Sequence, residues 1–250
     1  MQTLWKKLRW SIAQRGLLGT LKAVPKALTR RPSTTAPHPF DQRYGTDTSG
    51  LLGGGSLAIG HPNDIYITGY SGIPPSRFDA ALDRWQETIG AARIEDYTFI
   101  DLGCGKGRAL LLASRYPFRE VIGIELNPQL AAIAQRNAEH WQSLGEAHCP
   151  IRILVGDATE PALPAGPTLL FLYNAFAEPL VHRLARNLSS HPVDLIYQNA
   201  YFAEPFTPEL GYRELCNTVL PLSPEDASAD PVASPKDITI LFRVNVDTSK

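Results

Sequence analysis

The stretch Thr98-Phe-Ile-Asp-Leu-Gly-Cys-Gly-Lys-Gly107 decides the fold of this 250-residue chain. Apolar and β-branched residues run into Asp101, and glycines follow at positions 103, 105 and 107. The helical run Ala109-Leu-Leu-Leu-Ala113 begins immediately afterwards. We therefore predict a buried strand that ends in a glycine turn and opens a helix. This arrangement aims backbone N–H groups and a helix N-terminus at a ligand in the crevice.

The glycine spacing separates two classes of nucleotide-type ligand. The dinucleotide fingerprint is Gly-x-Gly-x-x-Gly/Ala, but the third position after Gly105 is Arg108, whose bulk would prevent close helix–strand packing. Asp101 stands two residues before the first glycine. A carboxylate at this turn would not stabilise a bound pyrophosphate, which is also negatively charged. It would stabilise a ligand that carries an ammonium group. The pattern favours the ammonium-bearing ligand, and a glycine turn that merely joins strand to helix is the alternative.

Two further acidic residues end predicted strands at suitable distances. Glu125 closes Val121-Ile-Gly-Ile-Glu125, 20 residues after Gly105, where ribose recognition requires a carboxylate that accepts from both hydroxyls. Asn127 and Pro128 then suit an N-cap and a first helical residue. Asp157 closes the run that begins at Ile151. Alone it would be read as a helix cap, but as the third acid in order it indicates a ligand contact.

These three segments resemble the class I S-adenosylmethionine-dependent methyltransferases, whose first motif has the form hydrophobic-Asp-Leu-Gly-x-Gly-x-Gly. The resemblance implies S-adenosylmethionine as cofactor and no metal. It also implies that Asp157 accepts from the adenine amine and that the next backbone N–H contacts a ring nitrogen. The cofactor-binding residues expected on this basis are Asp101, Gly103, Cys104, Gly105, Gly107, Glu125, Leu126, Asp157, Ala158 and Asn174.

From residue 97 onward, the chain alternates predicted strands and helices, which is typical of a doubly wound parallel sheet. We expect a Rossmann-like α/β fold with seven strands, mostly parallel, with an antiparallel C-terminal strand and an N-terminal helical and loop extension. The predicted strands are 97–102, 120–125, 151–155, 168–173, 193–199, about 212–220 and 237–246. The predicted helices are 106–116, 128–144 and 177–189, and 221–236 is expected to be a loop.

The methyl acceptor is expected beyond the fourth strand, because ligands of open α/β sheets bind beyond the carboxyl ends of the strands. Asn174 is placed to accept from an incoming amine, and Phe176 to pack against the acceptor. Tyr70 is the third candidate catalytic residue, as an aromatic wall of the acceptor pocket. The alternative is that Asn174 caps the next helix and Phe176 is core.

The run Phe171-Leu-Tyr-Asn-Ala-Phe176 narrows the resemblance. It is similar to the fourth motif of the disruptor-of-telomeric-silencing type histone lysine methyltransferases and of the ATP-synthase-subunit lysine methyltransferase group. Ala175 stands where similar bacterial sequences have Pro. The resemblance implies methyl transfer to nitrogen, with protein lysine as one acceptor. The rival interpretations are an oxygen or small-molecule methyltransferase, a non-catalytic S-adenosylmethionine-binding module and a nicotinamide dehydrogenase.

Residues 1–31 form a basic amphipathic arm by their pattern. The first 40 residues contain eight basic residues and no acidic one, although the whole chain has a net charge of −1. Leu4, Trp5, Leu8 and Ile12 lie on one stripe of a helix predicted over 4–23. Such an arm can contact an anionic membrane surface or nucleic acid, or can pack on its own domain or a partner.

Residues 32–75 combine a Pro-rich linker with a Gly-rich stretch that contains aromatic residues. Structureless segments of this length are functional or disordered, and the aromatic content argues against disorder. We expect this segment to act as a lid that folds over the cofactor crevice and shapes the acceptor pocket. Ser76 is expected to cap a helix over 77–89, which begins the methyltransferase domain, 76–250.

Composition restricts the cellular setting. Three cysteines lie far apart, at 104, 149 and 216, and no Cys/His spacing resembles a zinc site. We interpret them as reduced thiols of a cytoplasmic protein that can also associate peripherally with a membrane through its arm. No apolar run is long enough to span a membrane, and charges interrupt any signal-peptide core near the N-terminus.

Overall fold

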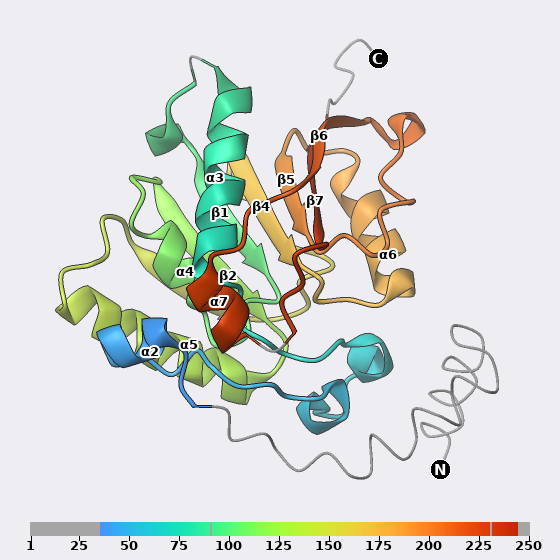
Figure 1. Ribbon diagram of the computed structural model, residues 1–250. Helices are drawn as coiled ribbons and strands as arrows, with labels where there is room; N and C mark the ends of the chain where they lie inside the picture. The colour runs from blue at the N-terminus through green and yellow to red at the C-terminus, as the bar shows by residue number, and fades with distance from the viewer. Residues whose placement is uncertain (1–35, 91, 231, 245–250) are drawn as a thin grey trace.

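A computed structural model describes residues 36–90, 92–230 and 232–244 of the chain (Figure 1). The helix expected over 4–23 and the rest of the basic arm lie outside these residues, so the arm and its contacts stay predictions. None of the helices in the described ranges is long and apolar enough to cross a bilayer.

A seven-stranded sheet in the order β3-β2-β1-β4-β5-β7-β6 forms the centre of the molecule. Five strands run parallel, β7 pairs antiparallel with β5, and β6 pairs antiparallel with β7. The prediction of a mostly parallel sheet with an antiparallel C-terminal strand is confirmed. The strands are β1 (Thr98–Leu102), β2 (Glu120–Glu125), β3 (Ile151–Val155), β4 (Thr168–Tyr173), β5 (Asp194–Gln198), β6 (Tyr212–Val219) and β7 (Ile238–Val244). The strand order reverses between β1 and β4, and the crevice above their carboxyl ends is where such sheets bind ligands.

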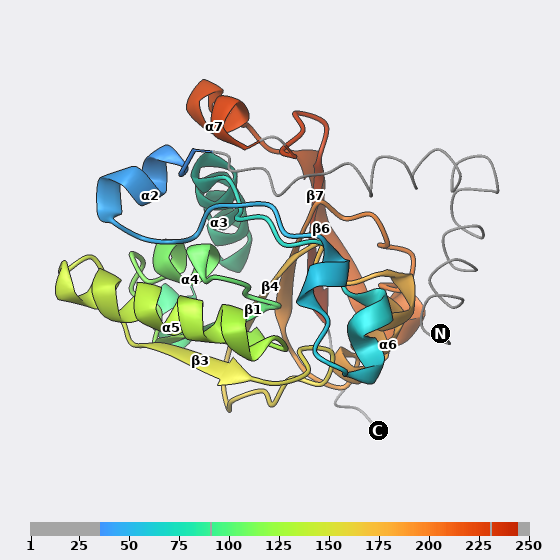
Figure 2. The same cartoon turned by 90° about the horizontal axis from the view of Figure 1, so that it is seen from below.

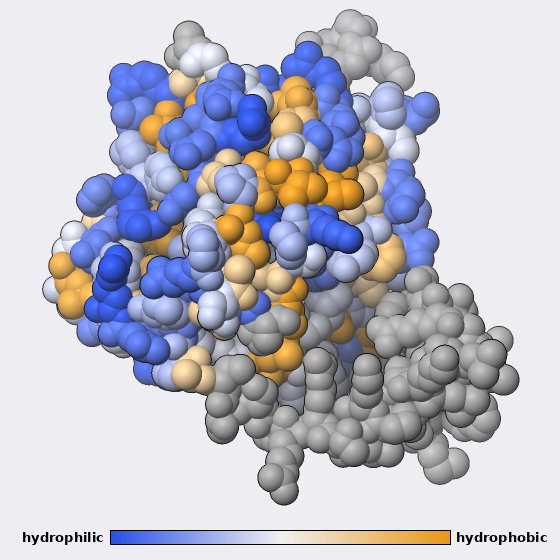
Figure 3. Space-filling view, viewed as in Figure 1, coloured by the Kyte–Doolittle hydropathy of each residue, from blue (hydrophilic) through white to orange (hydrophobic). Residues whose placement is uncertain are grey.

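Helices cover both faces of the sheet (Figure 2). They are α2 (Pro39–Tyr44), α3 (Pro75–Ile89), α4 (Arg108–Ala113), α5 (Pro128–Ser143), α6 (Glu178–Leu188) and α7 (Pro224–Ala229). Adjacent residues of β1 serve opposite faces: Phe99 packs with the cluster under α3, α4 and α5, and Ile100 with the cluster under α6. Hydrophilic side chains cover most of the face that α3 and α7 share, with hydrophobic residues between them (Figure 3).

Four local differences from the sequence expectations concern the extension and the C-terminal region. The linker contains α2, and the segment after it contains two 3₁₀ turns, Gly54–Leu57 and Pro62–Tyr66. The loop expected over 221–236 contains α7. Ser76 does not cap α3, which begins at Pro75, because its N–H and hydroxyl donate to Asp226 of α7. The predicted cap of α5 is confirmed, since Asn127 Oδ1 accepts from Gln129 N and Leu130 N.

Candidate functional site

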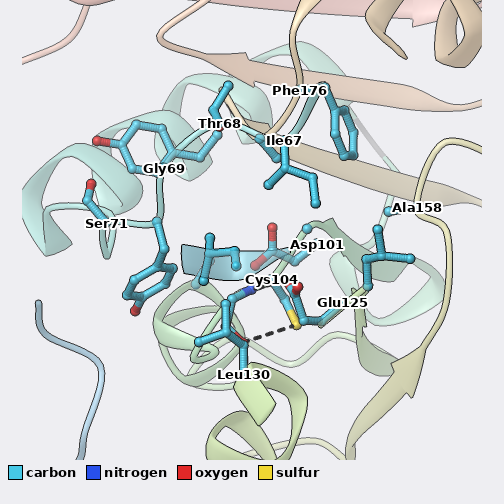
Figure 4. Close-up of a pocket in the computed structure, with 18 of the residues that line it drawn as sticks. Ile67, Thr68, Gly69, Ser71, Asp101, Cys104, Glu125, Leu130, Ala158 and Phe176 are labelled. Carbon is cyan, nitrogen blue, oxygen red and sulfur yellow. Dashed lines mark hydrogen bonds between the residues drawn. The ribbon is translucent and has the colours of Figure 1, made fainter. Parts of the chain in front are cut away.

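A pocket lies over the carboxyl ends of β1, β2 and β4 and encloses about 850 Å³, counting space that is open to solvent. Residues 52–73, here called the strap, cross this pocket (Figure 4). Asp101, Cys104 and Glu125 lie on one side of the pocket, and strap residues Ile67 and Thr68 face them from the other, beside Phe176 (Figure 4). The pocket therefore has a floor made by the sheet and a cover made by the N-terminal extension.

The glycine turn after β1 leaves no space for side chains. Gly103, Gly105 and Gly107 have φ values of 84°, 55° and 88°, in the left-handed region that favours glycine. A Cβ on Gly105 would come within 2.3 Å of the Tyr70 ring, and one on Gly103 within 2.7 Å of the Ala175 Cβ. Cys104 belongs to the core cluster at the edge of the pocket, and burial raises the pKa of its thiol far above the ordinary value, which disfavours the nucleophilic thiolate.

Asp101 ends β1 with a carboxyl group that is buried and has no cation beside it among the described residues. Burial, followed by the charge of Glu125, raises the pKa of Asp101 to about 8. A buried carboxyl of this kind gains an ion pair when a ligand brings an ammonium group. The residue therefore fits the aminoacyl ammonium of S-adenosylmethionine.

Glu125, at the end of β2, accepts hydrogen bonds from the glycine turn and from the start of α5. Its Oε2 accepts from Gly105 N and its Oε1 from Asn127 N, both at 2.8 Å. Burial raises the pKa of Glu125 although these hydrogen bonds oppose the shift. The N–H of Leu126 also contributes to this carboxylate, and a carboxylate has about four acceptor positions, so Glu125 keeps about one for a ligand hydroxyl. This geometry suits a ribose hydroxyl.

Asp157 lies in the pocket wall after β3. Other residues of the protein already donate hydrogen bonds to both of its carboxylate oxygens. Its Oδ1 accepts from Thr159 N (3.0 Å) and Thr159 Oγ1 (2.7 Å). Its Oδ2 accepts from Asn63 Nδ2 (2.7 Å) and Arg183 Nη2 (2.9 Å). Burial would raise the pKa of Asp157, but these partners outweigh it and lower the pKa. The carboxylate is thus a structural junction between the strap and α6.

The end of β4 carries Asn174 in a left-handed conformation, with φ 43°. Its backbone oxygen accepts from Thr68 Oγ1 at 2.6 Å, and its Oδ1 is buried without a hydrogen-bond partner in the described structure. Asn174 does not cap α6, whose N-cap is Ala177. The capping alternative is therefore wrong.

The structure brings most of the expected site residues to one pocket. Ten of them line it: Asp101, Gly103, Cys104, Gly105, Glu125, Leu126, Asp157, Ala158, Tyr70 and Phe176. Gly107 and Asn174 lie beside the pocket without lining it, Gly107 as the N-cap of α4. The Tyr70 hydroxyl donates to Thr48 O at 2.6 Å, which fixes its ring over the glycine turn.

Sequence reasoning missed the residues that hold the extension in place. Arg108 is buried and donates to Thr48 Oγ1 (2.7 Å), Ser49 Oγ (3.2 Å) and Ile73 O (3.3 Å). Lys106 Nζ contacts Asp47 Oδ1 and Ser49 O, both at 2.7 Å. Both cations lie in or directly after the glycine turn, yet nothing in the sequence indicates their partners, which stand 35 to 60 residues earlier.

Comparisons with known proteins give a family match and similar folds. Residues 99–198 match a family described as "Methyltransferase domain". No curated protein matches the chain. Similar solved structures include the small RNA methyltransferase HEN1, with 18% identity over 70% of this chain and 26% of that one (TM-score 0.50).

Two further solved structures have lower TM-scores. One is an RNA methyltransferase from Salinibacter ruber in complex with S-adenosyl-L-homocysteine, with 16% identity over 66% of this chain and 95% of that one (TM-score 0.42). The other is a mutant of MtNAS in complex with S-adenosylmethionine, with 21% identity over 68% of this chain (TM-score 0.45). This chain spans 62% of the MtNAS length. The Rossmann-like fold is confirmed, and the match to the methyltransferase family covers residues 99–198. The domain bounds 76–250 and the resemblance to lysine methyltransferase groups stay predictions.

Proposed function

We propose that this chain uses its methyltransferase domain to transfer a methyl group from S-adenosylmethionine to a nitrogen atom, with a protein lysine as the narrower candidate. The observation that carries the proposal is the pair of carboxyl groups at the ends of β1 and β2. Asp101 is buried with no cation beside it among the described residues, and Glu125 keeps an acceptor position beside it. Together they suit the ammonium and the ribose of one sulfonium nucleoside.

Each part of the pocket then has a role in holding the methyl donor. Asp101 pairs with the ammonium group, Glu125 accepts from the ribose, and the glycine turn lets the ligand approach the backbone. When bound, the cofactor supplies a methyl group that its sulfonium has already activated. The protein therefore contributes mainly position and exclusion of water, and the strap that covers the pocket serves both.

The support for a nitrogen acceptor comes from the end of β4. Asn174 Oδ1 is buried and unpartnered in the described structure, so it lacks a donor. An amine can donate an N–H to this oxygen and keep its lone pair for attack at the methyl carbon. Phe176 and Tyr70 supply apolar surface to the pocket, beside which Asn174 lies. Asn174 thus orients the acceptor, and no general base is required once the amine is neutral.

A labelling experiment tests this function. The full chain is incubated with cell lysate and S-adenosylmethionine that carries a labelled methyl group, with Asp101→Asn as the matched control. We expect labelled protein for the wild type, weaker labelling for the variant, and N-methyllysine after acid hydrolysis. Labelling on oxygen alone would overturn the nitrogen assignment. Binding of S-adenosylhomocysteine without any labelling would overturn catalysis, and binding of NAD instead would overturn the donor.

A further inference from the structure

We infer that Asn63 of the strap, and not Asp157, recognises the adenine edge of the methyl donor. This inference rests on the proposed function, because it names a recognition residue for the same donor. Asn63 lines the pocket beside Asp157, although the two residues stand 94 positions apart in the sequence.

The carboxylate of Asp157 already accepts all the hydrogen bonds that it can accept. An ionised carboxylate accepts about four hydrogen bonds and donates none. Thr159 supplies two donors to Oδ1, and Asn63 and Arg183 supply one each to Oδ2. An adenine amine would have to displace one of these donors, two of which come from parts of the chain that close the pocket. Asp157 therefore positions its neighbours instead of contacting the base.

The contact with Asp157 fixes the orientation of the Asn63 amide. Because the carboxylate can only accept, the amide nitrogen must face Asp157, which it contacts at 2.7 Å. The amide oxygen then points away from the carboxylate, and it accepts no hydrogen bond from the described residues. An asparagine side chain reads adenine with this pair of groups: the oxygen accepts from the exocyclic amine, and an N–H donates to a ring nitrogen.

Hydrogen bonds around Asn63 hold its backbone in place. Asn63 is 6% exposed and lies in the 3₁₀ turn Pro62–Tyr66. Its N–H donates to His61 Nδ1 at 3.2 Å, and Asp64 Oδ2 accepts from Ile59 N (2.9 Å) and Gly60 N (2.7 Å). Tyr66 O accepts from Ala177 N at 2.8 Å, which joins the turn to the start of α6. A binding group held by such a shell loses little freedom when the ligand arrives.

The arrangement gives the strap a part in donor selection. Asn63 reaches the pocket only because the strap crosses it. The strap thus acts as a specificity element for the donor as well as a cover.

The test compares two ligands that differ at the base edge. S-adenosylhomocysteine carries the exocyclic amine beside an accepting ring nitrogen, whereas S-inosylhomocysteine carries a carbonyl oxygen beside a ring N–H. Titration calorimetry on the full chain measures both affinities. We expect the wild type to prefer the adenine ligand by about fivefold or more, the usual range for a matched base contact. In Asn63→Ala this preference should fall to about twofold or less, mainly through weaker binding of the adenine ligand.

Control variants separate recognition from structure. Asn187 donates to Thr159 O at 2.9 Å in the same region but does not line the pocket, so Asn187→Ala should keep the preference. Asp157→Asn should also keep it, because an amide oxygen can still accept from Asn63. If Asn63→Ala does not fold, Asn63→Ser provides the same comparison.

Two results would contradict the inference in different ways. Full preference in the Asn63 variants together with its loss in Asp157→Asn would return adenine recognition to Asp157. A wild-type protein that binds neither ligand would overturn the proposed donor itself, and with it the role of Asn63.

Discussion

Asp101 differs from a carboxyl group in solution because the fold buries it beside a second acid. Burial, with Glu125 as the smaller cause, raises the pKa of Asp101 to about 8. At neutral pH most molecules of the unliganded protein therefore carry a protonated Asp101. The ammonium of the proposed donor pairs only with the ionised form, so the same residue links donor binding to pH.

Donor affinity should therefore rise with pH. Below pH 8 the carboxyl must lose its proton before it pairs with the ammonium, so we expect the affinity for S-adenosylhomocysteine to fall by about tenfold for each pH unit below 8. Calorimetry in two buffers with different ionisation enthalpies should show release of one proton at pH 6.5. Asp101→Asn should bind weakly and without this pH dependence. An affinity that stays constant between pH 6 and 8 in the wild type would contradict the assignment.

The same pKa predicts a change in stability without ligand. A carboxyl whose folded pKa lies above its unfolded value of 3.8 favours the folded state least when it is ionised. The wild type should thus lose stability as pH rises from about 4 to 8, whereas Asp101→Asn lacks this loss. Urea unfolding at pH 5, 6.5 and 8 should show that the free energy of unfolding of the variant, relative to that of the wild type, increases with each rise in pH. An equal difference at all three pH values would argue against a buried titrating carboxyl.

At the scale of elements, Arg108 at the start of α4 holds the extension against the sheet. Its guanidinium contacts the segment around Thr48 and the end of the strap at Ile73, and lies 3.8 Å from Asp41. Arg108 and Asp41 are both buried. Removing the guanidinium leaves the Asp41 charge inside the protein without its cation, so the loss exceeds that of ordinary packing.

We expect Arg108→Ala to lower the free energy of unfolding by about 3–5 kcal/mol, the range for breaking a buried ion pair. Limited proteolysis should cut the strap earlier than in the wild type. The control is Arg84→Ala, which removes an exposed partner of Glu87 on α3 and should cost less than about 1 kcal/mol. Similar losses for the two variants would show that Arg108 does not anchor the extension.

Comparison of the observed elements with the predicted ones shows which parts of the fold can be predicted from local sequence signals. The predicted strand 120–125 has the observed bounds, and the helix predicted over 128–144 is α5, Pro128–Ser143. Their periodicity and caps are local signals. The strap is different, because its form depends on contacts such as that between Thr68 and Asn174, 106 residues apart. Its role as a cover could be expected from composition and length, but its partners could not. The contact between Asn63 and Asp157, 94 residues apart, likewise has no sign in the sequence.

At the scale of the whole molecule, Asp226 of α7 joins three distant parts of the chain. Ser76 N at the start of α3 donates to its Oδ2 at 2.8 Å, and His38 Nε2 before α2 lies 3.3 Å from its Oδ1. Burial alone would raise the pKa of Asp226, but the contacts with His38 and Ser76 outweigh it and lower the pKa to about 2. The C-terminal half thus fastens the extension that covers the pocket.

Asp226→Asn should therefore destabilise the whole fold at pH 7 by about 1–3 kcal/mol, the range for losing charged hydrogen bonds of a buried group. Because the folded pKa lies below the unfolded value of 3.8, this contribution is complete above pH 3.8 and disappears as pH falls towards 2. Urea unfolding at pH 7 and pH 3 should show the difference from the wild type shrinking at the lower pH. The neighbouring exposed Glu225→Gln is the control and should change stability by less than about 0.5 kcal/mol at pH 7. A difference for Asp226→Asn that stays constant between the two pH values would mean that packing, and not the ionised carboxylate, joins α7 to the extension.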